Sequence, residues 1–303
     1  MKQFTLVVLF FLSFCMDCKT QVSIKSEYFG TSGYRDEHNE RVGDSKGSAL
    51  TYQASVNLPF SMKVDEKHRP TIWGLGLAGT YVSLDNKNFT EHLVLSEIMN
   101  LQLSLFHLRP ISEKWSVMAT LGVGIYTDNT RFSRIRFRNV LGGGAFVFIR
   151  RMFPSLDLGA GVALNNAFGY PMLFPALYVN WNYDGKFTFR FSALDGMNLL
   201  AGYNVNKSLS LNIVTEMGGQ MAMTEVKGKE KIFTHQYIVA GFRPEFKIAD
   251  RISIPVTVGV NAMRAAFYDD RSLSALFKSM GREYDPCFQV SPYVSAGIVF
   301  NLK

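Results

Sequence analysis

The chain has few cysteines, no long apolar run beyond its N-terminus and no block of one charge, and each absence excludes a class of protein. It has 3 cysteines in 303 residues, and only Cys287 lies outside residues 1–20. A single thiol cannot form an internal disulfide, which excludes a small disulfide-stapled domain. The composition is 47% hydrophobic with a mean hydropathy of +0.04. That is too polar for a bundle of membrane helices and too apolar for a disordered chain.

The N-terminus has the organisation of a secretory signal peptide. A short positive start precedes the apolar run Phe4–Phe14, which is too short for the ~20 residues of a spanning helix, and small or polar residues follow. We expect residues 1–20 to be removed by cleavage after Thr20, a loss of two lysines and one aspartate that lowers the net charge of +7 by one. The alternative, a lipoprotein signal, requires a small residue before Cys15 or Cys18, where phenylalanine and aspartate stand.

The remaining residues, 21–303, contain no linker or low-complexity tract, and one pattern organises them: apolar and polar residues alternate. A period of two indicates β-strands whose two faces meet different surroundings. The pattern is clearest at Leu50–Phe60, Trp115–Ile125, Ile252–Val260 and Phe288–Leu302.

The length of these strands favours a membrane barrel over a soluble β-sandwich. They exceed the ~5–6 residues typical of soluble strands and match the ~9–11 that a tilted membrane strand needs. Their polar faces are rich in Gly, Ser, Thr and Asn, whereas a face in open water carries more Lys and Glu. We therefore predict an all-β protein, a single closed antiparallel transmembrane β-barrel. A soluble secreted protein with a second sheet over the apolar faces is the alternative.

Fourteen candidate strands are joined by connections that alternate between mostly short and mostly long. Bacterial barrels have short turns on one side and long loops on the other, and an even count puts both termini on the short-turn side. The weakest assignment is 186–205, where two short strands could be one, so 12 strands is the alternative. The candidates are 21–30, 48–62, 71–84, 93–108, 114–126, 136–150, 155–165, 172–183, 186–193, 197–205, 208–221, 234–247, 251–267 and 286–303.

All 3 tryptophans lie at strand ends beside the short turns and on the apolar face, at Trp73, Trp115 and Trp181, and Phe300 lies at the same level. Aromatic rings collect at the boundary between hydrocarbon and headgroups, because they offer an apolar body and a polar edge. These four residues predict an aromatic girdle, with chance placement of core aromatics as the alternative.

With these features the chain resembles single-chain bacterial outer-membrane β-barrels, and among them barrels described only as domains of unknown function. The localised match is the closing strand, Tyr293–Phe300, which resembles the C-terminal insertion signal of such proteins, although Asn301–Lys303 follow the aromatic. The resemblance implies the outer membrane of a Gram-negative bacterium and contact with its lipid and lipopolysaccharide. It also implies insertion by the barrel-assembly machinery through the C-terminal strand.

Two glycine motifs have structural explanations. Residues Gly74–Gly79 have the spacing of a dinucleotide-binding loop, but they lie inside an alternating strand with no helix after it. We therefore interpret Gly74 and Gly76 as inward-facing wall residues. Gly142–Gly144 put glycine on both faces of one strand, which indicates either something packed against this wall inside the barrel or relief of crowding.

The inward faces of the later strands carry charge, at Arg190, Glu216, Arg243, Glu245 and Lys247. Charges inside a barrel must be paired or wet. They predict either a salt-bridge network that stiffens the lumen or a constriction that selects charged solutes. The near balance of signs favours the network.

A basic loop contains Arg131, Arg134, Arg136 and Arg138, and the strand expected from residue 136 would put the last three on one face. Such a face suits phosphates of lipopolysaccharide or an anionic solute, and a solvated rim is the alternative. Residues 270–281 show the only helical spacing, with a cap at each end. We expect an amphipathic helix that covers or plugs the barrel mouth; a self-packed loop is the alternative.

Catalytic, metal and cofactor patterns are weak. The 5 histidines lie mostly in loops or at strand ends, and none has a matched serine partner. No cluster has metal-ligand spacing, and no long basic run points to nucleic acid. The sequence therefore predicts a narrow or gated pore for small polar or anionic solutes. A membrane-embedded lipid-modifying enzyme and a structural or loop-display barrel without transport are the alternatives.

Overall fold

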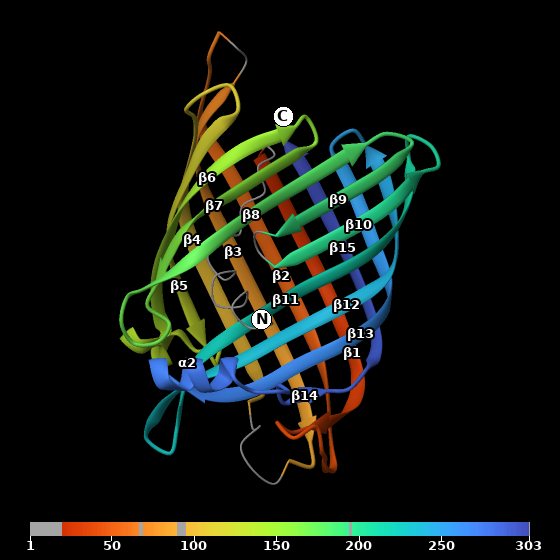
Figure 1. Ribbon diagram of the computed structural model, residues 1–303. Coiled ribbons are helices and arrows are strands. Elements are labelled where there is room, and N and C mark those ends of the chain that lie inside the picture. Colours follow the sequence, from red (N-terminus) through yellow and green to blue (C-terminus); the bar gives the residue numbers. More distant parts are fainter. Residues whose placement is uncertain (1–19, 67–68, 90–94, 194–195, 303) are drawn as a thin grey trace.

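The computed structural model describes residues 20–66, 69–89, 95–193 and 196–302. These residues form a closed antiparallel β-barrel of 14 strands (Figure 1). The last of these strands is interrupted, so it carries two labels, β14 and β15. The strand segments are β1 Thr20–Arg35, β2 Arg41–Val64, β3 Pro70–Lys87, β4 Glu97–Pro110, β5 Trp115–Thr127, β6 Val140–Phe153, β7 Leu156–Asn165, β8 Met172–Asp184, β9 Phe187–Ala193, β10 Met197–Asn204, β11 Leu209–Val226, β12 Lys229–Ala249, β13 Ile252–Asp270, β14 Cys287–Phe288 and β15 Ser291–Leu302.

The barrel closes through its first and last strands. β1 pairs with β15 from Thr20 opposite Leu302 to Phe29 opposite Tyr293, and with β2 on its other side. β14 and β15 each pair with both β1 and β13, so they are two parts of one barrel strand. The predicted fold class and strand count are confirmed, and residues 186–205 form two strands, β9 and β10. The signal peptide predicted at 1–20 lies almost wholly outside the described residues.

Several strands are longer than predicted, because the sheet continues past the level at which alternation stops. The connection expected between the candidate strands 208–221 and 234–247 is mostly strand. There, Lys227 and Gly228 have φ values of 52° and 77°, as in the two-residue turns that suit a hairpin twist. In contrast, β6 begins at Val140 and not at residue 136. The segment before it forms two 3₁₀ turns, η1 Phe132–Arg134 and η2 Phe137–Asn139, so the arginines there do not alternate along a strand.

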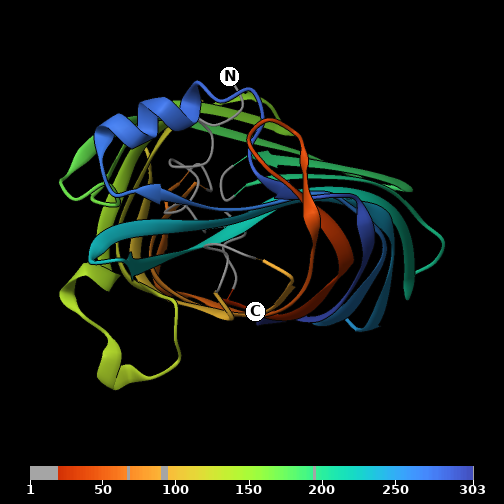
Figure 2. The ribbon, with the colours of Figure 1, turned by 90° about the horizontal axis from the view of Figure 1, so that it is seen from below.

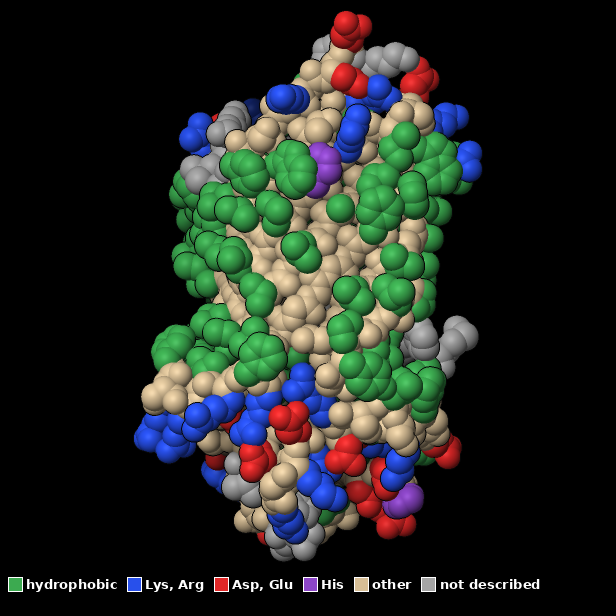
Figure 3. Space-filling view, turned by 90° about the vertical axis from the view of Figure 1, so that its left-hand side faces the viewer, with side chains coloured by type: hydrophobic (Ala, Val, Ile, Leu, Met, Phe, Trp, Pro, Cys, Tyr) green, Lys and Arg blue, Asp and Glu red, His purple; other side chains and the backbone are tan. Residues whose placement is uncertain are grey.

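The outer surface carries a broad apolar band with charged residues gathered beyond both of its edges (Figure 3). Leu121, Leu177 and Ile213 are 67%, 69% and 68% exposed, an arrangement that requires hydrocarbon contact and not water. All strands of the described residues belong to one sheet, so none covers this band as a sandwich would. Trp73, Trp115 and Trp181 are half exposed on the same face at the short-turn end, and Phe300 is half-buried there.

One part of the barrel wall is incomplete. β8 pairs with β9 only from Val179 to Asp184, and β10 pairs with β11 only up to Met197 opposite Met217. Within the described residues, Met172–Tyr178 of β8 therefore has no strand partner on that side. Residues 218–226 of β11 leave the wall and reach β5, where Met223 pairs with Thr127. Figure 2 shows the β11–β12 hairpin crossing the barrel mouth.

The remaining helix is α2, Leu273–Met280, within the segment 270–281. It lies at the end of the barrel opposite the chain's C-terminus (Figure 1). Among the described residues, no helix is long and apolar enough to cross a membrane.

Candidate functional site

A polar cavity of about 500 Å³ occupies the lumen. Strands β1–β4, β10–β13 and β15 line it, and the residues that reach it include Gln53, Ser55, Gln102 and Asn198. Alternation explains this lining, because the small and polar residues between the exposed apolar ones face inward. A cavity of this size is within the ordinary range of small-molecule sites.

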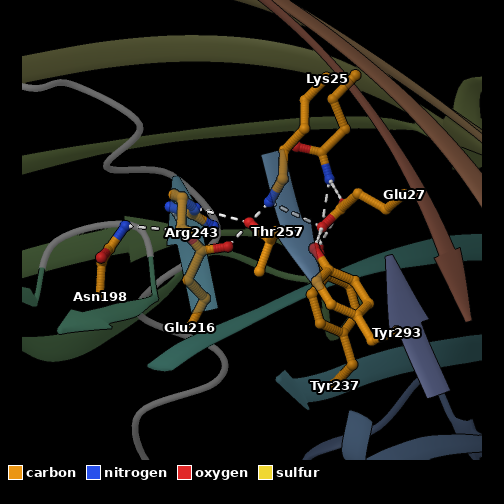
Figure 4. A network of polar contacts seen from close by, with 9 residues as sticks. Lys25, Glu27, Asn198, Glu216, Tyr237, Arg243, Thr257 and Tyr293 are labelled. Carbon is orange, nitrogen blue, oxygen red and sulfur yellow. Dashed lines mark hydrogen bonds and ion pairs between the residues drawn. The ribbon is translucent and has the colours of Figure 1, made fainter. Parts of the chain in front are cut away.

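Four charged residues cross the cavity as one network (Figure 4). The Lys25 ammonium lies 2.8 Å from a Glu27 carboxylate oxygen and 2.9 Å from Glu216 Oε2. Arg243 Nη1 lies 2.7 Å from Glu216 Oε1. Two cations and two anions alternate, so the network adds no net charge. A network of this kind offsets the cost of placing each charge away from bulk water.

Glu27 is the most enclosed member of the network, with no exposed surface. Besides Lys25, its carboxylate accepts hydrogen bonds from Tyr293 at 2.5 Å, Tyr237 at 3.0 Å and Gln53 at 2.6 Å. A buried carboxylate with this many donors is fixed in position. It joins β1 to β2, β12 and β15 across the lumen.

Arg243 lies at one end of the network, and one of its guanidinium nitrogens has no hydrogen-bond partner among the described residues. Its Nε donates to Thr257 Oγ1 at 2.7 Å, and Nη1 binds Glu216. The Nη2 atom is buried and has no hydrogen-bond partner among the described residues. Because Arg243 lines the cavity, this donor is available to an oxygen atom of a solute or a water molecule.

The structure brings together only part of the predicted charge cluster. Glu216 and Arg243 meet, whereas Arg190 binds Asp184 at 3.0 Å with both side chains largely exposed. Glu245 has no ion-pair partner within the described part of the chain, and Lys247 donates to Asn204 at 3.4 Å. Sequence reasoning missed the members that come from β1, although Lys25 and Glu27 share one face of the alternating segment at 21–30.

The β11–β12 hairpin closes the cavity at the mouth end. From Gln220 to Thr224, five consecutive residues are buried, so both faces of the hairpin are covered. Met221, Met223 and Ile232 belong to an apolar cluster with β3–β8, and Ala222 and Phe233 belong to another with β1–β4 and β12–β15. The hairpin therefore divides the outer half of the barrel into two packed cores.

The free edge of β11 is bonded to the opposite wall by asparagines. Asn139 donates to Met223 O at 2.7 Å and to Tyr126 O at 3.2 Å. With its side-chain amide turned so that the nitrogen faces the two carbonyls, Asn100 donates in the same way to Met221 O at 2.7 Å and to Met99 O at 3.0 Å. An edge strand inside a barrel needs such partners, because an unpaired buried carbonyl is costly.

The segment that crosses the mouth is the β11–β12 hairpin, whereas α2, the helix expected to cover or plug the mouth, packs beside it. Leu276 of α2 packs against the apolar cluster that contains Met221 and Ile232, while Phe277 is 61% exposed. Ser272 caps the helix by accepting a hydrogen bond from Ala275 N. Arg271, just before the helix, binds Glu230 at 3.0 Å and Ala167 O at 3.0 Å. It ties the hairpin to the β7–β8 loop, a role that no sequence pattern indicated.

The basic loop lies at the same end. Arg131, Arg134 and Arg136 are exposed, and Arg138 is half-buried. Arg138 Nη1 lies 2.5 Å from Glu225 Oε2, next to the hairpin turn. One of the four arginines therefore holds the closing hairpin instead of facing a solute.

Two buried or half-buried histidines have non-catalytic partners. His235 Nδ1 lies 2.9 Å from Gln220 Oε1, and His107 Nδ1 lies 2.9 Å from Ile72 O. Neither contacts a serine among the described residues. In the same part of the chain, no group of three or more His, Cys, Asp or Glu residues is placed to hold a metal ion.

Comparison with known proteins gives one family and several distant structures. The family model described as "Domain of unknown function (DUF6268)" matches residues 16–301. No curated protein matches. An outer membrane channel from Pseudomonas putida F1 has 8% identity and a TM-score of 0.46, with 95% of this chain and 97% of that chain covered. The outer membrane protein Omp33 of Acinetobacter baumannii has 8% identity and a TM-score of 0.41, with 94% and 99% covered.

Proposed function

The chain belongs to the DUF6268 family, and we propose that it is a gated channel of the outer membrane for small polar or anionic solutes, seen here in its closed state. The observation that carries the proposal is a polar cavity within a membrane barrel that ends at an apolar partition formed by the β11–β12 hairpin. A cavity lined by polar and charged side chains is the environment that a small polar solute needs on its way through a membrane barrel.

The partition is a suitable gate because it is a local element. Beyond Gly218 the hairpin has no partner on the β10 side among the described residues, while its β12 strand stays paired with β13 from Lys231 opposite Asp270 onward, so the hairpin would move together with that end of β13. Apart from the ladder between β12 and β13, its contacts are two apolar faces, a few hydrogen bonds and ion pairs at its turn. Gly218 and Gly219 stand where β11 leaves the wall, and glycine allows the backbone change that a hinge needs.

A hairpin-shortened variant tests the proposal. Residues 220–235 are replaced by a two-residue Asn-Gly turn, which joins Gly219 to Gln236, an opposed pair in the present register. In planar-bilayer recordings, we expect the native protein to give brief, small conducting steps and the variant to give larger, sustained ones. The matched control places Asn-Gly at 227–228 and keeps the full hairpin length.

The experiment has a clear negative outcome. Absence of conducting steps from both proteins, with both shown to be folded by heat-modifiable electrophoretic migration, overturns the channel. Selectivity is measured on the shortened variant by the reversal potential in a salt gradient. Because Arg243 Nη2 is an unpartnered cationic donor at the cavity wall, we expect anions to be favoured, and Arg243→Gln to reduce that preference.

A further inference from the structure

The loop between β5 and β6, residues 128–139, extends outward from the barrel, and we call it the arm. Figure 2 shows it reaching sideways past the outline of the wall. Within its two 3₁₀ turns, η1 and η2, only Asn139 is buried. The middle of the arm, residues 131–137, which we call its tip, therefore packs against little of the protein and exposes most of its side chains.

Both ends of the arm are fixed to the barrel, so the tip has a defined position. At the first end, the Thr130 N–H donates to Glu97 Oε1 of β4 at 3.0 Å. At the second end, Arg138 Nη1 lies 2.5 Å from Glu225 Oε2 of the hairpin turn. This ion pair neutralises the Glu225 carboxylate, which is therefore not free to neutralise the cations of the tip.

The arm begins at the mouth-side edge of the apolar band. On β5, Trp115 and Ile125 share the outward face, and Trp115 lies at the short-turn end. The strand between them, about ten residues of ~3.3 Å tilted by about 40°, rises about 25 Å, the height of the apolar band of a membrane barrel. The arm thus starts at the level of the lipid headgroups. Figure 3 shows Lys and Arg side chains gathered directly below the apolar band, at the mouth end.

The tip combines aromatic rings with cations. Phe132 is 66% exposed and Phe137 is 91% exposed. Arg131, Arg134 and Arg136 are exposed as well, and none of the three forms an ion pair among the described residues. The arm as a whole carries four arginines against one aspartate, so its net charge is +3.

This combination suits the membrane interface better than water. Segments that lie in the interface place aromatic rings at the apolar edge of the headgroup layer and basic side chains on its anionic groups. Guanidinium groups bind phosphate oxygens through charge-assisted hydrogen bonds. A soluble anion would use the arginines alone and would leave two phenylalanines wetted, whereas a lipid headgroup with its acyl layer accounts for both kinds of side chain.

We propose that the arm binds the phosphorylated headgroup of an outer-leaflet glycolipid, the chemistry of lipopolysaccharide. The three tip arginines contact its phosphates, and the two tip phenylalanines enter the apolar layer beside it. The proposal goes beyond the channel and does not depend on it, because the arm lies outside the lumen.

Native mass spectrometry of the full chain in detergent micelles, titrated with diphosphoryl lipid A, tests the proposal. We expect saturable binding, and weaker binding of monophosphoryl lipid A with the same acyl chains. The variant Arg131→Gln/Arg134→Gln/Arg136→Gln should bind diphosphoryl lipid A about 10- to 100-fold more weakly, because it loses three charge-assisted contacts with phosphate. Unchanged affinity in this variant overturns the proposal.

The matched control removes the same charge at the opposite end of the barrel, in Lys63→Gln/Arg109→Gln/Lys207→Gln, where all three side chains are exposed. Heat-modifiable electrophoretic migration shows whether each variant is folded. We expect the control to bind diphosphoryl lipid A as the native protein does. An equal loss in both triple variants would mean that binding follows the total charge, and the arm would not be the site.

A second variant, Phe132→Ser/Phe137→Ser, distinguishes a lipid from a soluble anion. We expect it to bind lipid A more weakly than the native protein does, and to bind the acyl-free disaccharide bisphosphate equally well. If instead it binds lipid A as the native protein does, and the acyl-free compound binds as tightly as lipid A, the arm holds a soluble anion and the lipid assignment fails. Failure of the channel in bilayer recordings would leave this result unchanged.

Discussion

The two asparagines that bond the hairpin edge to the opposite wall allow a quantitative prediction about gating. Asn100 and Asn139 each donate one hydrogen bond to a β11 carbonyl, at Met221 and Met223, and both side chains are buried. In the double variant Asn100→Ala/Asn139→Ala, the two carbonyls are buried without a partner when the hairpin is closed. When the hairpin is open, they can bond to water in both the variant and the native protein. An unsatisfied buried carbonyl costs about 1–3 kcal/mol, so the closed state loses about 2–6 kcal/mol relative to the open one.

At the lower bound this difference raises the ratio of open to closed channels about 30-fold. The assay is single-channel recording, with open probability as the readout and heat-modifiable migration as the test of folding. Asn206→Ala is the control, because Asn206 lies in an exposed turn and accepts a hydrogen bond only from Ser208 N among the described residues. An unchanged open probability in the folded double variant would refute the idea that this edge holds the gate.

Three further predictions concern stability and the membrane. Glu216→Gln leaves Lys25 and Arg243 without the carboxylate they share, and we expect the free energy of unfolding in urea to fall by about 3–5 kcal/mol. The double variant Glu216→Gln/Arg243→Met should recover part of this loss. Equal stability of the single and double variants would contradict the network. Leu121→Arg, near the middle of β5 on the outer face, should cost about 2–4 kcal/mol in folding into lipid vesicles, and Trp115→Arg at the strand end about 0–1 kcal/mol; the reverse order would misplace the membrane. Gly74→Val should destabilise the barrel by about 1–3 kcal/mol through contact with Phe106, and Phe106→Ala should rescue it if the clash is the cause.

The barrel was predictable because the alternation of apolar and polar residues can be read along each strand by itself, and it determines which face of the whole sheet meets hydrocarbon. Leu50–Phe60 shows one apolar face, and a strand of that length in one closed sheet has hydrocarbon as its only suitable neighbour. The alternation also held where strands were hardest to separate, at β9 and β10. It failed to give the ends of β11–β13, because there both faces are buried and the polar–apolar contrast that marks a membrane strand is lost.

The candidate site was only partly predictable. Glu216 and Arg243 could be placed on inner faces, but which charges meet depends on the register between strands far apart in the sequence. Lys25 joins Glu216 across 191 positions, which no local pattern shows. The apolar inner wall did leave a signal. Glycine on both faces of the strand at Gly142–Gly144 indicated either packing against that wall or relief of crowding, without showing what packs there.

A reversible cross-link between the hairpin and the opposite wall tests the closed gate most directly. Met223 and Thr127 are a paired bridge between β11 and β5, close enough for a disulfide when both are replaced by cysteine. The background variant is Cys287→Ser. We predict that oxidised Met223→Cys/Thr127→Cys shows no conducting steps and that reduction restores them. Equal conductance before and after reduction, with the disulfide verified, would contradict a gate formed by this hairpin.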